Sequence, residues 1–269
     1  MKTIKLFKDS LSYPSKDVDK LLTLGVLFFF DAIISLLPSL TTALGYGVLT
    51  QILYFISNII GIFIVLIAIG YLISIIKGTI NENVDIPSIR IIKNLSDGIK
   101  VFIVSIAYYL IPAIIVLIVA YLIGAYNIIS QIFASFFYFG IETSIPSYFM
   151  VETIPNIVII PIIATILFII STLFLVIAIA RFADSGNIKD GLNFKLVFSD
   201  IVKISWGKYI LLLVILFFIS LFILFVGFII SIIPFLGMII LFLVILPFMT
   251  IFYGRSIGLI YKKSKIRNF

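Results

Sequence analysis

The positions of the basic residues constrain this chain more than any other feature of its sequence. All 19 Lys and Arg residues lie in four segments, at 1–20, 77–100, 181–208 and 255–267. Long apolar runs separate these segments, and the other connections contain no Lys or Arg, at 38–48, 124–156 and 234–237. Because Lys and Arg are retained on the cytoplasmic side of a membrane, this alternation predicts a multi-pass protein of the cell membrane with cytoplasmic N- and C-termini.

The composition is incompatible with a water-soluble globular fold. Hydrophobic residues make up 63% of the chain and charged residues 12%, with a mean hydropathy of +1.33. Soluble domains are roughly 45–50% apolar and about 25% charged. We therefore predict an all-α polytopic transmembrane helix bundle that forms a single membrane domain over 1–269. Its six expected spans lie at about 21–37, 49–76, 101–123, 157–180, 209–233 and 238–261.

The sequence lacks the residues on which many enzymes and metal sites depend. It contains no Cys and no His, which excludes disulfides, thiolate nucleophiles, Cys/His metal sites and histidine proton relays. Phosphate-binding loops, dinucleotide fingerprints and calcium-binding loops are also missing from it. We expect a protein that is not an enzyme and that uses no metal or cofactor.

The most strongly amphipathic segment precedes the fifth span. Its apolar residues follow the i, i+3, i+4, i+7, i+8 spacing of one helical face, at Phe194, Val197, Phe198, Ile201 and Val202. Polar residues occupy the other face, at Lys195, Ser199, Asp200 and Lys203. This pattern predicts an interfacial helix on the cytoplasmic side of the membrane, and residues 1–20 show a weaker version of it.

The four basic segments carry 19 Lys and Arg against nine Asp and Glu. Each well-placed basic residue attracts anionic lipid headgroups by ~1 kcal/mol, so the lipid bilayer is the expected partner. Docking of partner proteins on the same face is an alternative that the charge does not distinguish. Nucleic acid is not an expected partner, because the basic residues are spread between spans and form no binding module.

One acidic residue lies inside an expected span. Counted from Lys20, Asp31 is about 16 Å along a helix, near the centre of a hydrocarbon core ~30 Å thick. A carboxylate there costs roughly 2.5–3.5 kcal/mol unless it has a partner or water. Arg255, in the sixth span, is a candidate partner for an intramembrane polar pair. The alternatives are a solute or proton pathway at Asp31, a neutral Asp31, or a first span shifted so that Asp31 is shallower.

Two prolines lie inside expected spans, Pro112 in the third and Pro247 in the sixth. Proline removes a helical hydrogen bond, and the broken helices of transporters use the carbonyls that this frees. Such helix breaks are candidate functional features, and an ordinary kink is the alternative.

The apolar stretch 124–156 is unlike a span, because its polar residues gather on one helical face. It is expected to be a helix at the opposite interface, a re-entrant helix, or a continuation of the third span beyond the bilayer.

Several motifs along the chain resemble one known family. They are SYPSKDVDKLLTLGVLF, GYLISIIKGTINENVDIP, LSDGIKVFIVSIAYYLIP, ARFADSGNIKDGLNF, WGKYILLLVI and ILPFMTIFYGRSIGLIY. In this order they resemble the uncharacterised archaeal-type membrane family designated domain of unknown function 4013. The chain departs from the family after Pro87, where an acidic and aromatic turn is replaced by the more basic and aliphatic SIRIIKNLSDG. The resemblance implies one multi-span membrane domain and no particular activity.

Two functional hypotheses follow from these features. The first is a non-enzymatic membrane protein that organises lipid or partner proteins through its basic cytoplasmic face. The second is a small-solute transporter or permease with a pathway near Asp31 and Arg255. A water-filled cavity that reaches Asp31 favours the second hypothesis, and a solidly packed bundle favours the first.

Overall fold

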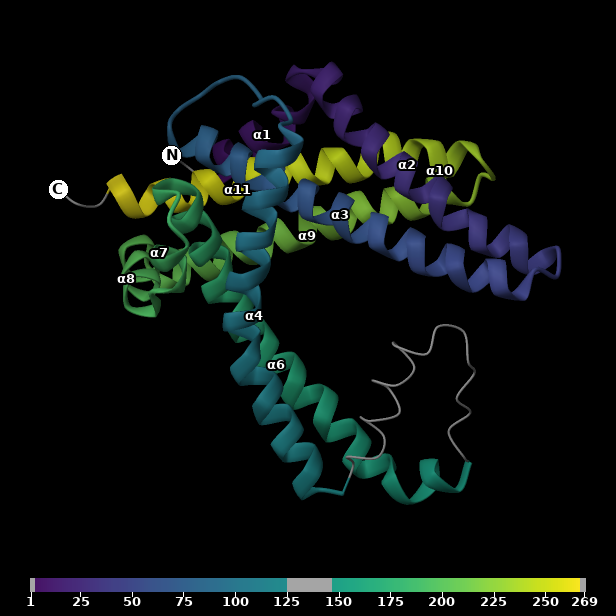
Figure 1. Ribbon diagram of the computed structural model, residues 1–269. Coiled ribbons are helices and arrows are strands. Elements are labelled where there is room, and N and C mark those ends of the chain that lie inside the picture. The colour runs from purple at the N-terminus through teal and green to yellow at the C-terminus, as the bar shows by residue number, and fades with distance from the viewer. Residues whose placement is uncertain (1–2, 125–146, 267–269) are drawn as a thin grey trace. The chain divides into compact units, whose positions relative to one another are not determined.

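The computed structural model describes residues 3–124 and 147–266, and these are almost entirely helical (Figure 1). No strand occurs among them. The elements are α1 (Thr3–Ser12), η1 (Pro14–Lys16), α2 (Val18–Ala43), α3 (Gly47–Ile80), α4 (Ile91–Leu122), α6 (Ser147–Ser185), α7 (Ile188–Leu192), α8 (Phe194–Ile204), α9 (Trp206–Ser231), α10 (Leu236–Ile240), η2 (Leu241–Ile245) and α11 (Leu246–Ile266).

Six helical stretches in the described chain are long and apolar enough to cross a membrane. They are α2, α3, α4, residues Val158–Ser185 of α6, α9, and Leu236–Lys265. Both the predicted all-α class and the predicted number of spans are confirmed. The protein is a multi-pass membrane protein, because helices of this length and hydropathy satisfy their backbone hydrogen bonds inside a bilayer.

The first span is longer than predicted, because Pro38 does not end it. Helix α2 continues to Ala43, and the hydroxyls of Thr41 and Thr42 each donate to the Pro38 carbonyl at 2.9 Å. The helix stops one turn later, where Gly45 adopts a φ of +79° that glycine tolerates without a steric cost. An internal proline lacks the backbone N–H that would donate to the carbonyl four residues earlier. The loss of this one hydrogen bond did not end the helix.

The chain divides into two compact units. Unit 1 comprises residues 1–104 and 176–269, and unit 2 comprises residues 105–175. The boundaries fall inside α4 and α6, so each of these helices contributes to both units. The prediction of a single membrane domain stays a prediction.

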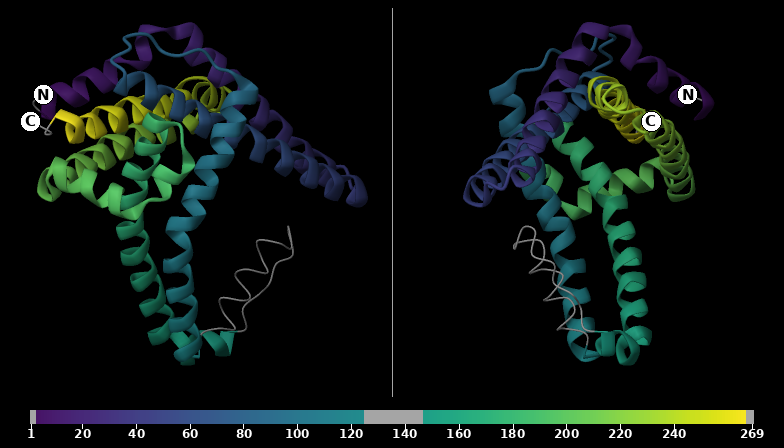
Figure 2. Two further views of the ribbon diagram at one scale, coloured as in Figure 1. Left: turned by 60° about the vertical axis from the view of Figure 1, so that its left-hand side comes forward. Right: turned by 90° about the vertical axis from the view of Figure 1, so that its right-hand side faces the viewer.

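Three helices form the centre of unit 1. Helices α2, α3 and α11 pack against one another, with η2 against α2. Their shared core contains Leu24, Ala68, Tyr71, Ile75 and Ile251, all buried. Helix α1 lies along α11 in every view, and α8 packs on α9 and α11 (Figures 1 and 2).

Glycines allow two close helix contacts in this core. Gly254 and Gly258 form a GxxxG pair on α11, and a Cβ at Gly258 would lie 2.7 Å from the Cβ of Thr79 on α3. A Cβ at Gly25 on α2 would lie 2.3 Å from the carbonyl oxygen of Leu243 in η2. The backbones therefore approach more closely at these points than larger residues allow.

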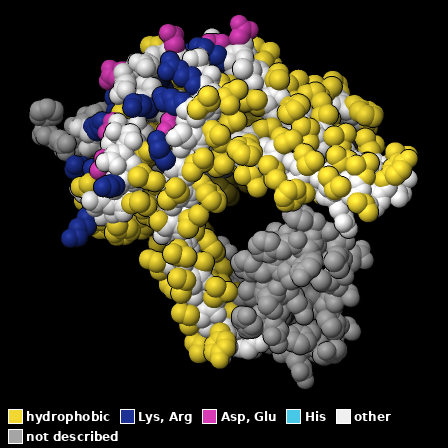
Figure 3. All heavy atoms as spheres, viewed as in Figure 1, with side chains coloured by type: hydrophobic (Ala, Val, Ile, Leu, Met, Phe, Trp, Pro, Cys, Tyr) yellow, Lys and Arg dark blue, Asp and Glu magenta, His cyan; other side chains and the backbone are white. Residues whose placement is uncertain are grey.

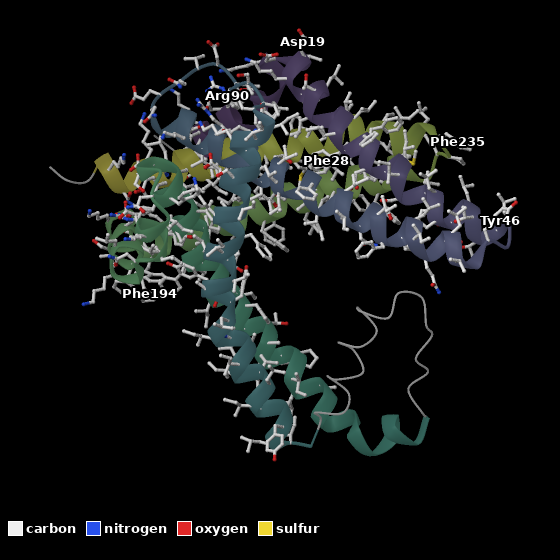
Figure 4. The ribbon with its side chains drawn as sticks, in the orientation of Figure 1. Asp19, Phe28, Tyr46, Arg90, Phe194 and Phe235 are labelled. Atoms are coloured by element: carbon white, nitrogen blue, oxygen red, sulfur yellow. The ribbon has the colours of Figure 1, made fainter. Side chains whose placement is uncertain are left out.

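With the exception of Asp31, the charged residues of unit 1 gather at one end of its helices (Figure 3). Arg90 and Phe194 lie toward that end, and Tyr46 and Phe235, in the uncharged connections, lie at the other (Figure 4). We call the charged end the basic end and define it by residues 1–20, 77–100, 181–208 and 255–265. The charged connections thus lie at the basic end of unit 1, and the uncharged connections at Tyr46 and Phe235 lie at the opposite end.

Unit 2 contains the outer parts of α4 and α6. The Tyr109 hydroxyl lies 2.8 Å from the Thr172 hydroxyl, and the Tyr109 and Phe168 rings are 5.4 Å apart. Residues 125–146, most of the stretch for which an interfacial helix or a continuation of the third span was expected, lie outside the described residues.

Candidate functional site

Arg255 belongs to a cluster at the basic end and does not pair with Asp31. Its Nε donates to Asp9 Oδ2 at 2.8 Å, and its Nη1 donates to the Asn83 carbonyl at 3.3 Å. The guanidinium also lies 4.5 Å from the centre of the Tyr13 ring. Burial raises the pKa of the Tyr13 phenol, and the nearby Arg255 charge partly opposes this rise. The predicted pair with Asp31 is therefore wrong, because α1 supplies the carboxylate.

Asp31 instead lines a hollow of about 510 Å³ between α2 and α3. The polar residues around it are Ser35, Tyr54, Ser57 and Asn58. The Ser57 hydroxyl and the Asn58 side-chain amide donate to the Tyr54 carbonyl, at 3.1 and 2.7 Å. The Asp31 Oδ1 is buried and has no hydrogen-bond partner among the described residues. A Cβ at Gly61 would lie 3.1 Å from this oxygen, so the glycine leaves room for the carboxylate.

The two prolines differ in their surroundings. Pro112 is buried in unit 2, and α4 continues through it to Leu122. Pro247 follows the π-helical segment η2, and it has no N–H to donate to the Leu243 carbonyl four residues earlier. That carbonyl faces Gly25 of α2. The helix continues through Pro247 as it does through Pro112, so neither proline breaks its helix, and Pro247 lies next to a tight helix contact, apart from the residues that line the Asp31 hollow.

The predicted amphipathic segment forms α8, and its apolar face divides into two rows. Val197 and Ile201 are fully buried in unit 1, whereas Phe194, Phe198 and Val202 remain 53%, 44% and 48% exposed. The Phe198 ring lies 6.5 Å from that of Phe194 and 5.9 Å from that of Trp206. One row therefore fixes the helix to the protein, and the other forms an apolar rim on the surface.

The polar side of α8 is also tied to the protein. Asp200 is buried and accepts from Arg181 Nη1 at 2.6 Å, with Lys203 Nζ 3.8 Å away. Asn193 accepts from the Leu196 N–H at 3.2 Å and so caps the start of the helix. These contacts set the orientation of the exposed rim.

The connection between α3 and α4 is held by four side-chain donors from separate parts of unit 1. The side chains of Tyr13, Lys20 and Tyr71 donate to the carbonyls of residues 85, 86 and 87 at 2.9, 2.5 and 3.0 Å. The fourth donor is Arg255, on the Asn83 carbonyl. The loop is therefore a fixed part of unit 1, although it contains no regular helix.

This loop borders a second hollow, of about 460 Å³, which we call the basic hollow. It is lined by Ser74, Lys77, Gly78, Asn81, Asn83, Val84, Asp85, Ile86, Pro87, Ser88, Arg90 and Lys93. The side chains of Lys77, Arg90 and Lys93 are exposed and take part in none of the ion pairs formed by the described residues. Asp85 is the only acidic residue in this lining.

Sequence reasoning did not single out the basic hollow. Its three basic residues enter the sequence analysis only as part of the overall positive charge of the four basic segments, and they are 13 and 3 residues apart in the chain. Their convergence depends on the fold of the loop between them. Within the described chain, no three Asp or Glu residues come together to form a metal site.

Comparisons with known proteins add the family. Neither the curated proteins nor the solved structures contain a match to this chain. The family described as "Protein of unknown function (DUF4013)" matches residues 52–232, which include most of α3, α4, the basic hollow and α8. This match covers more than half of the chain, and the protein therefore belongs to the DUF4013 family.

Proposed function

We propose that this protein is a non-enzymatic membrane protein that binds anionic lipid at its basic end and thereby organises lipid or partner proteins at the cytoplasmic surface. The observation that carries the proposal is the divided apolar face of α8. A helix with one row buried in the protein and a second row of Phe194, Phe198 and Val202 exposed matches a helix at the membrane interface.

The charges around this rim support the same function. Lys195, Lys203 and Lys208 flank it, and Trp206 begins the next span. Tryptophan is enriched where the hydrocarbon core meets the headgroups. With the rim at that depth, the basic end faces the headgroup layer, where each well-placed charge contributes about 1 kcal/mol toward anionic lipid.

The experiment uses Trp206, the only tryptophan in the chain. The protein is reconstituted in bilayers that contain lipids brominated near the headgroup or near the end of the acyl chain. We expect stronger quenching of Trp206 fluorescence by the shallow bromines. We also expect brominated phosphatidylglycerol to quench more than brominated phosphatidylcholine at the same mole fraction, because the basic end enriches anionic lipid around itself.

A matched variant separates charge from depth. Exchanging Lys195 and Lys208, which form no ion pair among the described residues, for Gln should reduce the preference for phosphatidylglycerol around Trp206 and leave the depth of Trp206 unchanged. Equal quenching by both lipids in the unmodified protein would contradict the proposal. Stronger quenching by the deep bromines would contradict the interfacial place of α8.

A second candidate function, a small-solute permease, has one specific observation in its favour. The Asp31 carboxylate lines a hollow with other polar side chains and has an unpartnered oxygen, and ionisable residues inside a span often mark solute or proton pathways. Arg255 takes no part in it, since it is bound to Asp9. The chain has no native cysteine, so an Asp31→Cys variant reports directly on water access through a membrane-impermeant thiol reagent. Labelling of the folded variant supports the permease, and protection contradicts it.

A further inference from the structure

The basic hollow has the chemistry of a phosphate site. We propose that Lys77, Arg90 and Lys93 bind the phosphate of an anionic lipid headgroup in this hollow. The inference rests on the proposed function and deepens it, because it places one lipid at defined residues. The shared chemistry of the ligand is a phosphate group, which either a lipid headgroup or free phosphate carries.

The pairing of charges at the basic end separates these three residues from their neighbours. Several other basic residues of the basic end are neutralised within the protein: Lys20 by Asp17, Lys100 by Asp97, Arg255 by Asp9, and Lys262 by Glu82. Lys77, Arg90 and Lys93 form no such pair among the described residues, yet they line the same hollow. Three basic residues around one hollow with a single acid leave an excess of positive charge that an anion neutralises.

The loop adds hydrogen-bond donors to the lining, and several of its carbonyl acceptors are occupied. The carbonyls of residues 83, 85, 86 and 87 are already bound to side chains of the protein. The N–H groups of Val84, Ser88 and Arg90 have no acceptor among the described residues. Side-chain donors of Ser88 and Asn81 lie in the same lining. A lining rich in donors and cations suits the oxygens of a phosphate, which accept hydrogen bonds.

The position of the hollow favours a lipid as the source of the phosphate. Lys77 lies three residues before the end of α3, directly after the apolar part of that span. Arg90 immediately precedes α4 and Lys93 lies in its first turn. The hollow therefore lies where two spans leave the hydrocarbon core, at headgroup depth. Its volume of about 460 Å³ is in the range of small-ligand pockets, which are roughly 300–1,000 Å³.

The experiment is a calorimetric titration of the purified full chain in neutral detergent. The ligands are dioctanoyl phosphatidic acid, dioctanoyl phosphatidylcholine and inorganic phosphate. We expect phosphatidic acid to bind, excess inorganic phosphate to displace it, and phosphatidylcholine to bind at least about tenfold more weakly. The triple variant Lys77→Gln, Arg90→Gln and Lys93→Gln should lose at least about tenfold in affinity for phosphatidic acid.

The matched control is a second triple variant, Lys189→Gln, Lys195→Gln and Lys208→Gln. It removes the same charge from exposed residues of the basic end that lie outside the hollow. We expect it to lose less than about threefold in affinity. Equal losses in the two triple variants would overturn the hollow as a site and leave the broader lipid proposal in place.

Two further outcomes are decisive. Inorganic phosphate that binds as tightly as phosphatidic acid would overturn the lipid as the ligand and assign the site to free phosphate. A wild-type chain with no preference for phosphatidic acid over phosphatidylcholine would overturn the proposed function together with this inference.

A variant that is expected to gain affinity tests the site even if the triple variant Lys77→Gln, Arg90→Gln and Lys93→Gln is unstable. Asp85 is exposed and its carboxylate forms no ion pair among the described residues. Asp85→Asn removes the one negative charge from the lining, so affinity for phosphatidic acid should rise by about threefold or more. An unchanged or lower affinity in this variant would contradict the site.

Discussion

Two hollows of similar size lie along the same helix, α3, and they have opposite charge. The first, about 510 Å³, is lined by Asp31 and residues 54–69 of α3, which are mostly apolar. The second, about 460 Å³, is lined by the end of α3 and the loop after it, with three basic residues. The Asp31 hollow thus lies within the apolar part of the span, and the basic hollow lies where the span ends.

The comparison shows how a structural charge differs from a charge available to a ligand. Arg255, whose side chain is 12% exposed, contacts a carboxylate, a carbonyl and an aromatic ring. Asp31 and the three basic residues of the second hollow have no ion-pair partner in the described chain. Removal of a partnered charge should therefore cost stability, and removal of an unpartnered charge should not.

The largest expected effect is on the partnered charge. Arg255→Gln leaves Asp9 without its cation and weakens the tie between α11 and the Asn83 loop. We expect it to lower the free energy of unfolding by about 2–3 kcal/mol, somewhat less than for a fully buried pair because Asp9 is 31% exposed. Thermal or denaturant unfolding in detergent measures the change. A loss within experimental error would show that the cluster is not structural.

Asp31→Asn should change stability in the opposite direction. It removes an unpartnered carboxylate from an apolar span, so we expect the free energy of unfolding to rise by about 1–2 kcal/mol. The double variant with Arg255→Gln should be additive within about 0.5 kcal/mol, because the two residues do not touch. Non-additive energies would indicate that Asp31 and Arg255 interact after all.

A smaller, pH-dependent effect is expected from Glu82 and Lys262. The hydrogen bond from Lys262 lowers the pKa of Glu82 below its ordinary value of 4.5. A lowered folded-state pKa means that the contribution to stability is present above the unfolded pKa and is lost as the pH falls through the folded pKa. The Glu82→Gln variant should therefore have a slightly lower melting temperature than the unmodified protein at pH 7, and this difference in melting temperature should vanish at acidic pH. A difference that persists at acidic pH would contradict the electrostatic origin.

The smallest expected effect on stability comes from the basic hollow. Arg90→Gln and Lys93→Gln remove exposed charges that have no partner in the described chain, so each should change the free energy of unfolding by less than about 0.5 kcal/mol. The same unfolding measurement, made beside Arg255→Gln, tests this. A large loss in either variant would mean that its charge supports the fold.

The sequence was sufficient for the spans and insufficient for the sites. Long apolar runs specify transmembrane helices, and the number of spans and the all-α class follow from them. The helix ends depended on local backbone conformation, as at Gly45, which ends α2 instead of Pro38. The partner of Arg255 is Asp9, 246 residues away, and no periodicity relates those two positions.

The candidate sites show the same division. The spacing of the α8 residues predicted a helix with one apolar face, and the structure divides that face into buried Val197 and exposed Phe198. This division depends on how α8 packs on α9 and α11. The basic hollow forms because four distant side chains hold one loop in place, among them Tyr13 and Tyr71. Local patterns carry no information about such long-range contacts.

The most direct test of the account compares the two hollows in one measurement. Native mass spectrometry counts the phosphatidic acid molecules retained by the unmodified protein, by Arg90→Gln and by Asp31→Asn. If the lipid phosphate binds in the basic hollow, Arg90→Gln should weaken retention about fivefold, the equivalent of ~1 kcal/mol for one basic residue. Asp31→Asn should leave retention unchanged. Unchanged retention in Arg90→Gln with a loss in Asp31→Asn would contradict lipid binding in the basic hollow and place the functional site at the Asp31 hollow.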